Sequence, residues 1–225
     1  MVRQEEEGVL SYYKQSAFGI QLRTNGYGAF YELGRMKSPR ITNIYTLEIT
    51  EIKHPKEEKF HGSDGFFGNT FIYGKINNFY QARLGFGKQY ILGQKGNKNG
   101  IAVIGSLQGG LSLGLLKPYY LEVENAAGER EEIRYTPKDS ALFLTGRIFG
   151  SSGFTKGWSE LEFNPGVYAK TALRFDFGRF NESVSALEIG FSVDAFSKKV
   201  PLMLLNPEKQ LFYQGHIAFV FGRRK

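Results

Sequence analysis

Two histidines and three carboxylates lie close together between residues 54 and 64. His54 and His61 are accompanied by Glu57, Glu58 and Asp64. Imidazole and carboxylate groups at short spacing can bind a metal ion or act as a general acid–base pair. Here the spacing is loose, it matches no HExxH-like framework, and the chain contains no Cys to supply thiolate ligands. We therefore expect no metal, cofactor-binding or catalytic site here, and we interpret the stretch as a polar loop.

A second set of ionisable residues alternates with apolar residues in the C-terminal third of the chain. The ionisable set is Lys170, Arg174, Asp176, Glu188, Asp194 and His216. The apolar set is Leu173, Phe175, Ile189, Phe191, Ile217, Phe219 and Phe221. Successive side chains of a strand point to opposite faces, so each set should occupy one face of a sheet. If the ionisable face is buried, its charges must pair.

The elements that must position these residues are strands. Period-two alternation predicts eight of them, over residues 17–24, 27–36, 43–53, 79–92, 101–116, 166–177, 184–196 and 211–222. Asn25-Gly26 separates the first two and is a strong hairpin signal, because both residues tolerate positive φ. The 28 Gly, 20 Phe and 13 Tyr of the chain suit strands and turns. We find no amphipathic helical segment and no internal repeat.

The lengths of the connections indicate how the strands are arranged. Connections 54–78, 117–164 and 197–210 are long, whereas 37–42, 93–100 and 178–183 are short. In an up-and-down barrel, alternate connections lie at the same end, so the long loops would gather at one end and the other short turns at the opposite end. The Asn25-Gly26 turn is the exception, because it is short and falls at the end of the long loops. This separation of long loops from short turns is the arrangement of an outer-membrane barrel with extracellular loops and periplasmic turns. We therefore predict a single all-β domain over 1–225, in which 1–16 is a periplasmic segment.

Alternation alone does not decide which face points inward. A soluble sandwich or lipocalin-like barrel would bury the apolar face, whereas a membrane barrel would bury the charged one. The polar faces combine Gly, Ser and opposite charges, which suits a filled lumen. Aromatic residues near strand ends would then form interfacial girdles: Tyr27, Tyr31, Tyr80, Tyr90, Phe177, Phe196, Tyr213 and Phe221. We therefore prefer the transmembrane barrel, without an open pore.

Charge and hydropathy agree with this preference. No run of about 18 apolar residues predicts a transmembrane helix. The net charge of +7 would suit nucleic acid or an anionic membrane, but basic residues do not interleave with aromatics on one face, so we expect no nucleic-acid partner. The first residues lack an apolar signal-peptide region, so the chain is either cytosolic or numbered after signal removal. The barrel favours the second.

Aromatic residues in the long connections are candidates for contact with a partner. They are Phe66, Phe67, Tyr119, Tyr120, Phe149, Phe154 and Trp158. Phe66 and Phe67 could instead cap the barrel mouth. Connection 117–164 is too long to be a mere link. It contains a predicted hairpin around 125–128 and an apolar stretch at 140–154, which would be a short helix or a segment folded over the barrel.

Several blocks resemble a known family. They are GIQLRTNGYGAFYELGRMKS (19–38), IKHPKE (52–57), IYGKINNFY (72–80) and GLSLGLLKPYYLEV (110–123). Over roughly 17–123, these blocks resemble small outer-membrane β-barrel proteins of the Bacteroidota, which are mostly uncharacterised. The resemblance implies an eight-stranded barrel, a cleaved signal peptide and an outer-membrane location, and it implies no enzymatic site.

Three functions remain open at this stage. The leading hypothesis is a non-enzymatic structural or accessory subunit of an outer-membrane protein complex, acting in assembly or secretion, that docks partners through its loops and contacts the lipid bilayer and lipopolysaccharide. The first alternative is a small outer-membrane enzyme that modifies lipid A or another lipid. The second is a soluble lipocalin-like carrier.

Overall fold

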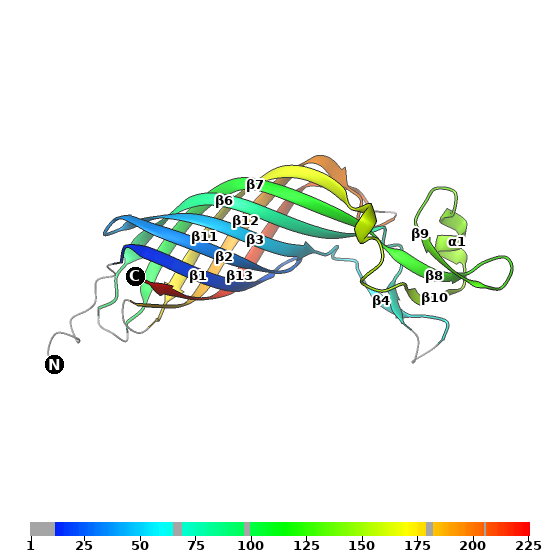
Figure 1. Cartoon of the computed structure of the whole chain (residues 1–225), viewed down its shortest axis with the longest axis horizontal. Helices are drawn as coiled ribbons and strands as arrows, with labels where there is room; N and C mark the ends of the chain where they lie inside the picture. The colour runs from blue at the N-terminus through cyan, green and yellow to red at the C-terminus, as the bar shows by residue number, and fades with distance from the viewer. Residues whose placement is uncertain (1–11, 65–68, 97–99, 179–181, 205) are drawn as a thin grey trace.

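Eight strands close into an antiparallel barrel in the part of the chain that the computed structural model describes, which is residues 12–64, 69–96, 100–178, 182–204 and 206–225. The strand order around the barrel is β1-β13-β12-β11-β7-β6-β3-β2 (Figure 1). Their bounds are β1 (Lys14–Arg23), β2 (Gly26–Ser38), β3 (Ile41–Ile52), β6 (Asn77–Gly93), β7 (Ala102–Pro118), β11 (Glu162–Asp176), β12 (Ser183–Val200) and β13 (Lys209–Arg224). The all-β, up-and-down barrel predicted from alternation is confirmed.

The first and last strands close the ring. In the antiparallel register between β1 and β13, Ile20 lies opposite Phe219 and Leu22 lies opposite Ile217. The backbone N–H of Tyr13 donates to the carbonyl of Lys225 at 2.7 Å. Closure leaves no unpaired sheet edge, which is the condition for a sheet to stand in a bilayer.

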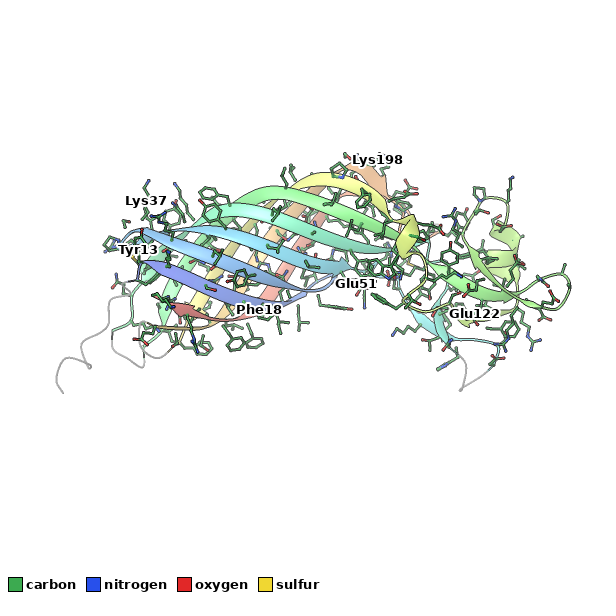
Figure 2. The ribbon with its side chains drawn as sticks, in the orientation of Figure 1. Tyr13, Phe18, Lys37, Glu51, Glu122 and Lys198 are labelled. Atoms are coloured by element: carbon green, nitrogen blue, oxygen red, sulfur yellow. The ribbon has the colours of Figure 1, made fainter. Side chains whose placement is uncertain are left out.

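The two ends of the barrel differ, and we name them by their connections. At the turn end lie the start of β1, the end of β13 and the connections 39–40, 94–101 and 177–182. At the loop end lie the two-residue β1–β2 turn, the connections 53–76 and 119–161, and the β12–β13 connection 201–208. Figure 2 shows labelled Tyr13 and Lys37 at the turn end and Glu51 and Lys198 towards the loop end.

Two of the loop-end connections fold into a separate lobe, which we call the head (Figure 1). Connection 53–76 forms the hairpin of β4 (Lys59–His61) and β5 (Thr70–Ile72). Connection 119–161 forms β8 (Tyr120–Glu124), β9 (Arg130–Arg134), α1 (Ser140–Thr145), β10 (Ile148–Ser151) and the 3-10 turn η3 (Trp158–Glu160). The hairpin expected around 125–128 is the β8–β9 pair, and 140–154 contains both a short helix and a strand.

The head has an apolar core of its own. Its buried members are Phe71, Leu121, Val123, Ile133, Phe143 and Ile148. They come from both connections, so the core joins the two segments. The Ser63 N–H also donates to the Ile148 carbonyl at 2.8 Å. Apolar burial across the two segments therefore gives the head a defined shape.

Several predicted boundaries were wrong. The region 197–210 is not a long loop, because β12 continues to Val200 and β13 starts at Lys209. Likewise β7 runs to Pro118 and β11 starts at Glu162, so the strands take up both ends of the predicted 117–164 loop. At the N-terminus, β1 already begins at Lys14 rather than after residue 16, while residues 1–11 lie outside the described part. No helix in the described ranges is long and apolar enough to span a membrane.

Candidate functional site

The outer face of the barrel is apolar. The seven residues predicted to face lipid all lie on it: Leu173, Ile189, Phe191, Ile217, Phe219 and Phe221 are exposed, and Phe175 is half-buried. The same face carries exposed apolar side chains from every other barrel strand, among them Ile20, Leu33, Leu47, Leu84 and Leu111. A continuous exposed apolar band around a closed barrel, with charges inside it, is the distribution of a transmembrane barrel.

Aromatic residues lie near both borders of this band. Six of the residues predicted to form girdles are exposed on the outer face: Tyr27, Tyr31, Tyr90, Phe177, Tyr213 and Phe221. Tyr80 is partly covered, because its ring stacks on that of Trp158 with centroids 5.6 Å apart. The prediction was wrong for Phe196, which is 5% exposed and lies inside the barrel. It follows Asp194 on the inner face, so its parity is that of the charged residues.

Arg174 of β11 contacts carboxylates on two other strands, Glu32 of β2 across the interior and Glu188 of the neighbouring β12. Its guanidinium donates to both carboxylate oxygens of Glu32 at 2.9 and 3.0 Å. It also donates to Oε2 of Glu188 at 2.7 and 2.9 Å. Oε1 of Glu188 lies 3.2 Å from Nζ of Lys170 and 3.2 Å from Nε2 of His216. Each of these side chains is almost fully buried, so their charges depend on one another for solvation.

Arg83 organises the rest of the central network. It donates to Glu48 at 2.7 Å and to Asp194 through Nε at 3.0 Å and through Nη2. Glu48 also lies 3.5 Å from Nη1 of Arg23 and 3.6 Å from Nζ of Lys170. The network therefore holds four cations and four carboxylates. The cations are Arg23, Arg83, Lys170 and Arg174, and the carboxylates are Glu32, Glu48, Glu188 and Asp194.

Asp176 belongs to a smaller cluster near the turn end. Its carboxylate pairs with Arg224 and lies 3.6 Å from Nζ of Lys95. Arg224 also donates to the side-chain oxygen of Gln15 at 3.0 Å. Burial lowers the pKa of Lys95, although the charge of Asp176 opposes this. Through Asp176, this cluster links the C-terminal strand β13 to the connection 94–101, which is distant from it in the sequence.

An apolar plug closes the loop end of the interior. Its members on inward-facing strand positions are Ile52, Phe79, Leu116, Phe196 and Phe212, and the β12–β13 connection adds Leu202 and Met203. The rings of Phe79 and Phe196 meet edge to face with centroids 5.1 Å apart. Side chains therefore occupy the interior from the charged middle to the loop end, as an eight-stranded barrel permits.

The six ionisable residues predicted to share the inner face are all buried inside the barrel. They form two groups rather than one, because Asp176 pairs near the turn end. The central network has four charged members that were missed, namely Arg23, Glu32, Glu48 and Arg83, and the partners of Asp176, Lys95 and Arg224, were missed as well. Alternation could have found Glu32, Glu48 and Arg83, since each falls between outward apolar residues on its strand. Which residues pair could not be found, because the pairs span up to 142 residues of sequence.

The predicted partner-contact residues do not form one surface. The Tyr119 hydroxyl accepts from the Ile72 N–H at 3.0 Å inside the head, where burial raises the pKa of Tyr119. Tyr120 donates to Oε1 of Glu160 at 2.7 Å. Phe149 is 8% exposed, because Arg130 and Arg147 lie 4.1 and 5.5 Å from its ring centre.

Phe154 and Trp158 lie apart from the three residues just described, beside the outer face of the barrel at β6. Their rings meet at 5.3 Å, and Trp158 stacks on Tyr80 of β6. The ammonium of Lys117 lies 4.5 and 5.0 Å from the two ring centres. An aromatic cluster at the end of the apolar band suits a membrane interface. Phe66 and Phe67 lie outside the described residues.

His54 and two of the carboxylates near it have partners of their own. Nδ1 of His54 accepts from the Lys56 N–H at 3.2 Å, and burial lowers the pKa of His54, with the charge of Lys209 lowering it further. Glu57 pairs with Lys75 at 2.7 Å. Asp64 pairs with Arg130 at 2.8 Å. Within the part of the chain that is described, no three His, Asp or Glu side chains are placed to hold a metal ion.

Comparisons with known proteins give similarity only to solved structures. No family model and no curated protein matches the sequence. Neisserial surface protein A is 8% identical, with 95% of this chain and 97% of that chain covered and a TM-score of 0.46. Ail, the attachment invasion locus protein of Yersinia pestis, in complex with the heparin analogue sucrose octasulfate, is 9% identical, with 96% and 100% covered and a TM-score of 0.44. A second Ail structure is 8% identical, with the same coverage and a TM-score of 0.42.

Proposed function

We propose that this chain is an integral outer-membrane barrel that serves as a non-enzymatic accessory subunit of an outer-membrane protein complex. The barrel anchors the chain, and the head docks a protein partner. The observation that carries the proposal is a folded head with its own apolar core, mounted on a barrel whose interior is filled with side chains. As part of this proposal, the chain is related to the small outer-membrane barrels of the Bacteroidota that the blocks between residues 17 and 123 resemble.

The exposed apolar band supports the location. Such a band would be unfavourable in water, since apolar patches this large mark a membrane or protein interface. Closed barrels that span bacterial outer membranes place their longer loops outside the cell. By this rule the head is extracellular and the turn end is periplasmic. The exposed Arg35, Lys37, Arg40, Arg223 and Lys225 then lie at the periplasmic rim.

The head is suited to docking because its surface is fixed. Four exposed ion pairs link its segments to one another: Arg130–Asp64, Arg134–Glu160, Arg147–Glu124 and Lys156–Glu132. Each is worth little to stability at a solvated surface. Together they present a defined pattern of charge, and charge complementarity sets the specificity and rate of association.

The alternatives fit the geometry less well. An enzyme acting on lipid needs a nucleophile and a base in contact, whereas among the described contacts His54 bonds the backbone of Lys56 and lies near the charges of Lys209, Glu57 and Lys56. A lipocalin-like carrier needs an apolar cavity inside the barrel, and here the middle of the interior holds the buried charges of Arg83 and Arg174.

Charge reversal on the head should abolish association with the partner. Arg130 and Arg147 both lie over Phe149 and are exposed, and arginines beside aromatic rings often dominate interface energies. We expect the variant Arg130→Glu/Arg147→Glu to lose proteins that co-purify with the wild-type chain in mild detergent. The matched control is Lys198→Glu/Lys199→Glu, which reverses two exposed charges on β12 near the same end. Recovery of the wild-type chain alone under every mild condition would contradict the accessory role.

The head should also unfold separately from the barrel. Phe143 is fully buried in the head core and contacts Tyr135 at 5.6 Å between ring centres. Phe143→Ala should lower the head's stability by about 3–5 kcal/mol, through lost burial and a cavity. Limited proteolysis should then cleave within 119–161 and leave the barrel intact, while the exposed control Lys138→Ala resists cleavage. Loss of the barrel together with the head would show that the two do not fold separately.

A further inference from the structure

A cavity of about 350 Å³ lies at the loop end of the barrel. Its position follows from the strand order. The β1–β2 turn is only two residues long, and it lies between β13 and β3, whose connections are longer. All residues that line the cavity come from these three places: Thr24 and Asn25, the 53–55 segment, and the stretch 200–213. The cavity therefore forms above the short β1–β2 turn, between the longer connections on either side of it.

The cavity combines positive charge with an apolar wall. Lys53, His54 and Lys209 supply its basic groups, and no carboxylate is among the described residues that line it. Leu202, Met203 and Leu211 form part of the apolar wall. A volume of this size falls in the range of small-ligand sites, which pair an apolar lining with a few placed polar groups.

Glu57, the carboxylate that contacts the backbone of His54, is paired with a lysine outside the cavity. Its Oε2 pairs with Lys75 at 2.7 Å, and its Oε1 accepts from the backbone N–H of His54 at 3.0 Å. Lys209 lies close enough to His54 for its charge to lower the pKa of that imidazole, in addition to burial. Lys53 is half-buried, with its ammonium 4.9 Å from the ring centre of Tyr27.

One polar atom at the cavity has no partner. Oδ1 of Asn25 is buried and has no hydrogen bond among the described residues. The backbone of the same residue is fixed, since its carbonyl accepts from the Lys53 N–H at 2.7 Å. A buried acceptor without a donor costs free energy unless a ligand or water satisfies it. A hydroxyl group of a ligand in the cavity could do so.

The cavity is continuous with the outer apolar face. Leu211 and Tyr213 line it, and both side chains are exposed on the outside of β13, at 49% and 63%. Ile217 and Phe219 continue the same row toward the middle of the barrel. A molecule in the cavity could therefore lay an acyl chain along β13 while its polar part stays with Lys53 and Lys209.

We propose that this cavity binds the phosphorylated sugar headgroup of an outer-leaflet glycolipid, with one acyl chain lying along β13. Lysine ammonium groups attract the phosphate, the Asn25 amide takes a sugar hydroxyl, and the apolar wall takes the start of the acyl chain. The assignment rests on the proposed insertion in the outer membrane, because that places the cavity level with the outer-leaflet headgroups.

The test is lipid binding by the purified full chain in detergent, measured by native mass spectrometry. The probes are bisphosphorylated lipid A, dephosphorylated lipid A and inorganic phosphate. We expect the wild-type chain to bind the phosphorylated lipid, and the variant Lys53→Gln/Lys209→Gln to bind it at least about tenfold more weakly. The control Lys198→Gln/Lys199→Gln removes two exposed lysines outside the cavity and should bind as the wild type does.

Three results would overturn the inference. These are equal binding of the dephosphorylated lipid, equal loss in the control variant, and binding of inorganic phosphate as tight as that of the lipid. The last would make the cavity a site for free anions. Heat-modifiable migration of each variant in gel electrophoresis reports the barrel separately. A folded, membrane-inserted barrel that binds no lipid would refute the cavity assignment alone, whereas a chain absent from membranes would refute the proposed function.

Discussion

Replacing Arg174 with Met should lower the free energy of unfolding by about 3–5 kcal/mol, the usual cost of removing one partner of a buried ion pair. Arg174 is the only side chain that donates to both Glu32 and Glu188 among the described contacts. Its loss leaves Glu32 with hydrogen bonds from the neutral Gln15 and Gln89 only. A carboxylate buried without a compensating charge is strongly unfavourable. Urea unfolding of the refolded chain in detergent or lipid vesicles measures the change.

A double variant sharpens this prediction. Glu32→Leu together with Arg174→Met removes one anion and one cation, and Glu188 keeps Lys170 and His216. The double variant should therefore be more stable than Arg174→Met alone, which is a non-additive result expected for coupled residues. Arg223→Met, on the exposed rim of β13, is the neutral control. If Arg174→Met were no more destabilising than Arg223→Met, the interior would have to contain water that solvates the charges.

Replacing Ile217 with Lys should be the second most damaging change. Ile217 is 50% exposed and lies in the middle of β13, opposite Leu22 on β1 and Ile189 on β12. A Lys on the lipid face near the bilayer centre costs about 2–4 kcal/mol. Assembly into membranes should fall accordingly, as measured by heat-modifiable barrel in outer-membrane fractions or by urea titration in vesicles.

The matched control for this change is Ile217→Leu, which keeps an apolar group of the same size and should be tolerated. The comparison separates lipid contact from packing, because both variants alter the same site. Equal tolerance of Lys and Leu at position 217 would place the outer face of β13 in water. That outcome would favour the alternative hypothesis of a soluble barrel.

Alternation in the sequence was sufficient for the fold because each barrel strand has one apolar and one polar face. On β13, Gln214 and His216 fall between Tyr213 and Ile217, and the structure buries the first pair and exposes the second. Alternation misassigns the face where an apolar residue occupies an inward position, as at Phe196 and Phe212. Those residues form the plug, and nothing local distinguishes an inward phenylalanine from an outward one.

The pairing inside the barrel and the head were less predictable, because both depend on distant segments. Glu32 meets Arg174 only because the ring brings β2 and β11 to face each other across the interior. The head core joins Phe71 to Phe143 and Leu121, which belong to two different connections. The cavity above the Asn25 turn depends on how three connections fold next to one another. Only the lengths of these connections can be read from the sequence.

The most direct test of the account is a spin-label scan along β13, which is simple because the chain has no native Cys. Single Cys substitutions at Tyr213, Ile217, Phe219 and Phe221 would each carry a nitroxide in a chain reconstituted in lipid vesicles, with Gln214, His216 and Val220 as inward positions. The account predicts that outward labels collide with oxygen, which dissolves in lipid, more than with a water-soluble nickel chelate. Inward labels that still allow folding should be shielded from both. Preferential collision of the outward labels with the nickel chelate would contradict the central claim that this barrel spans a membrane.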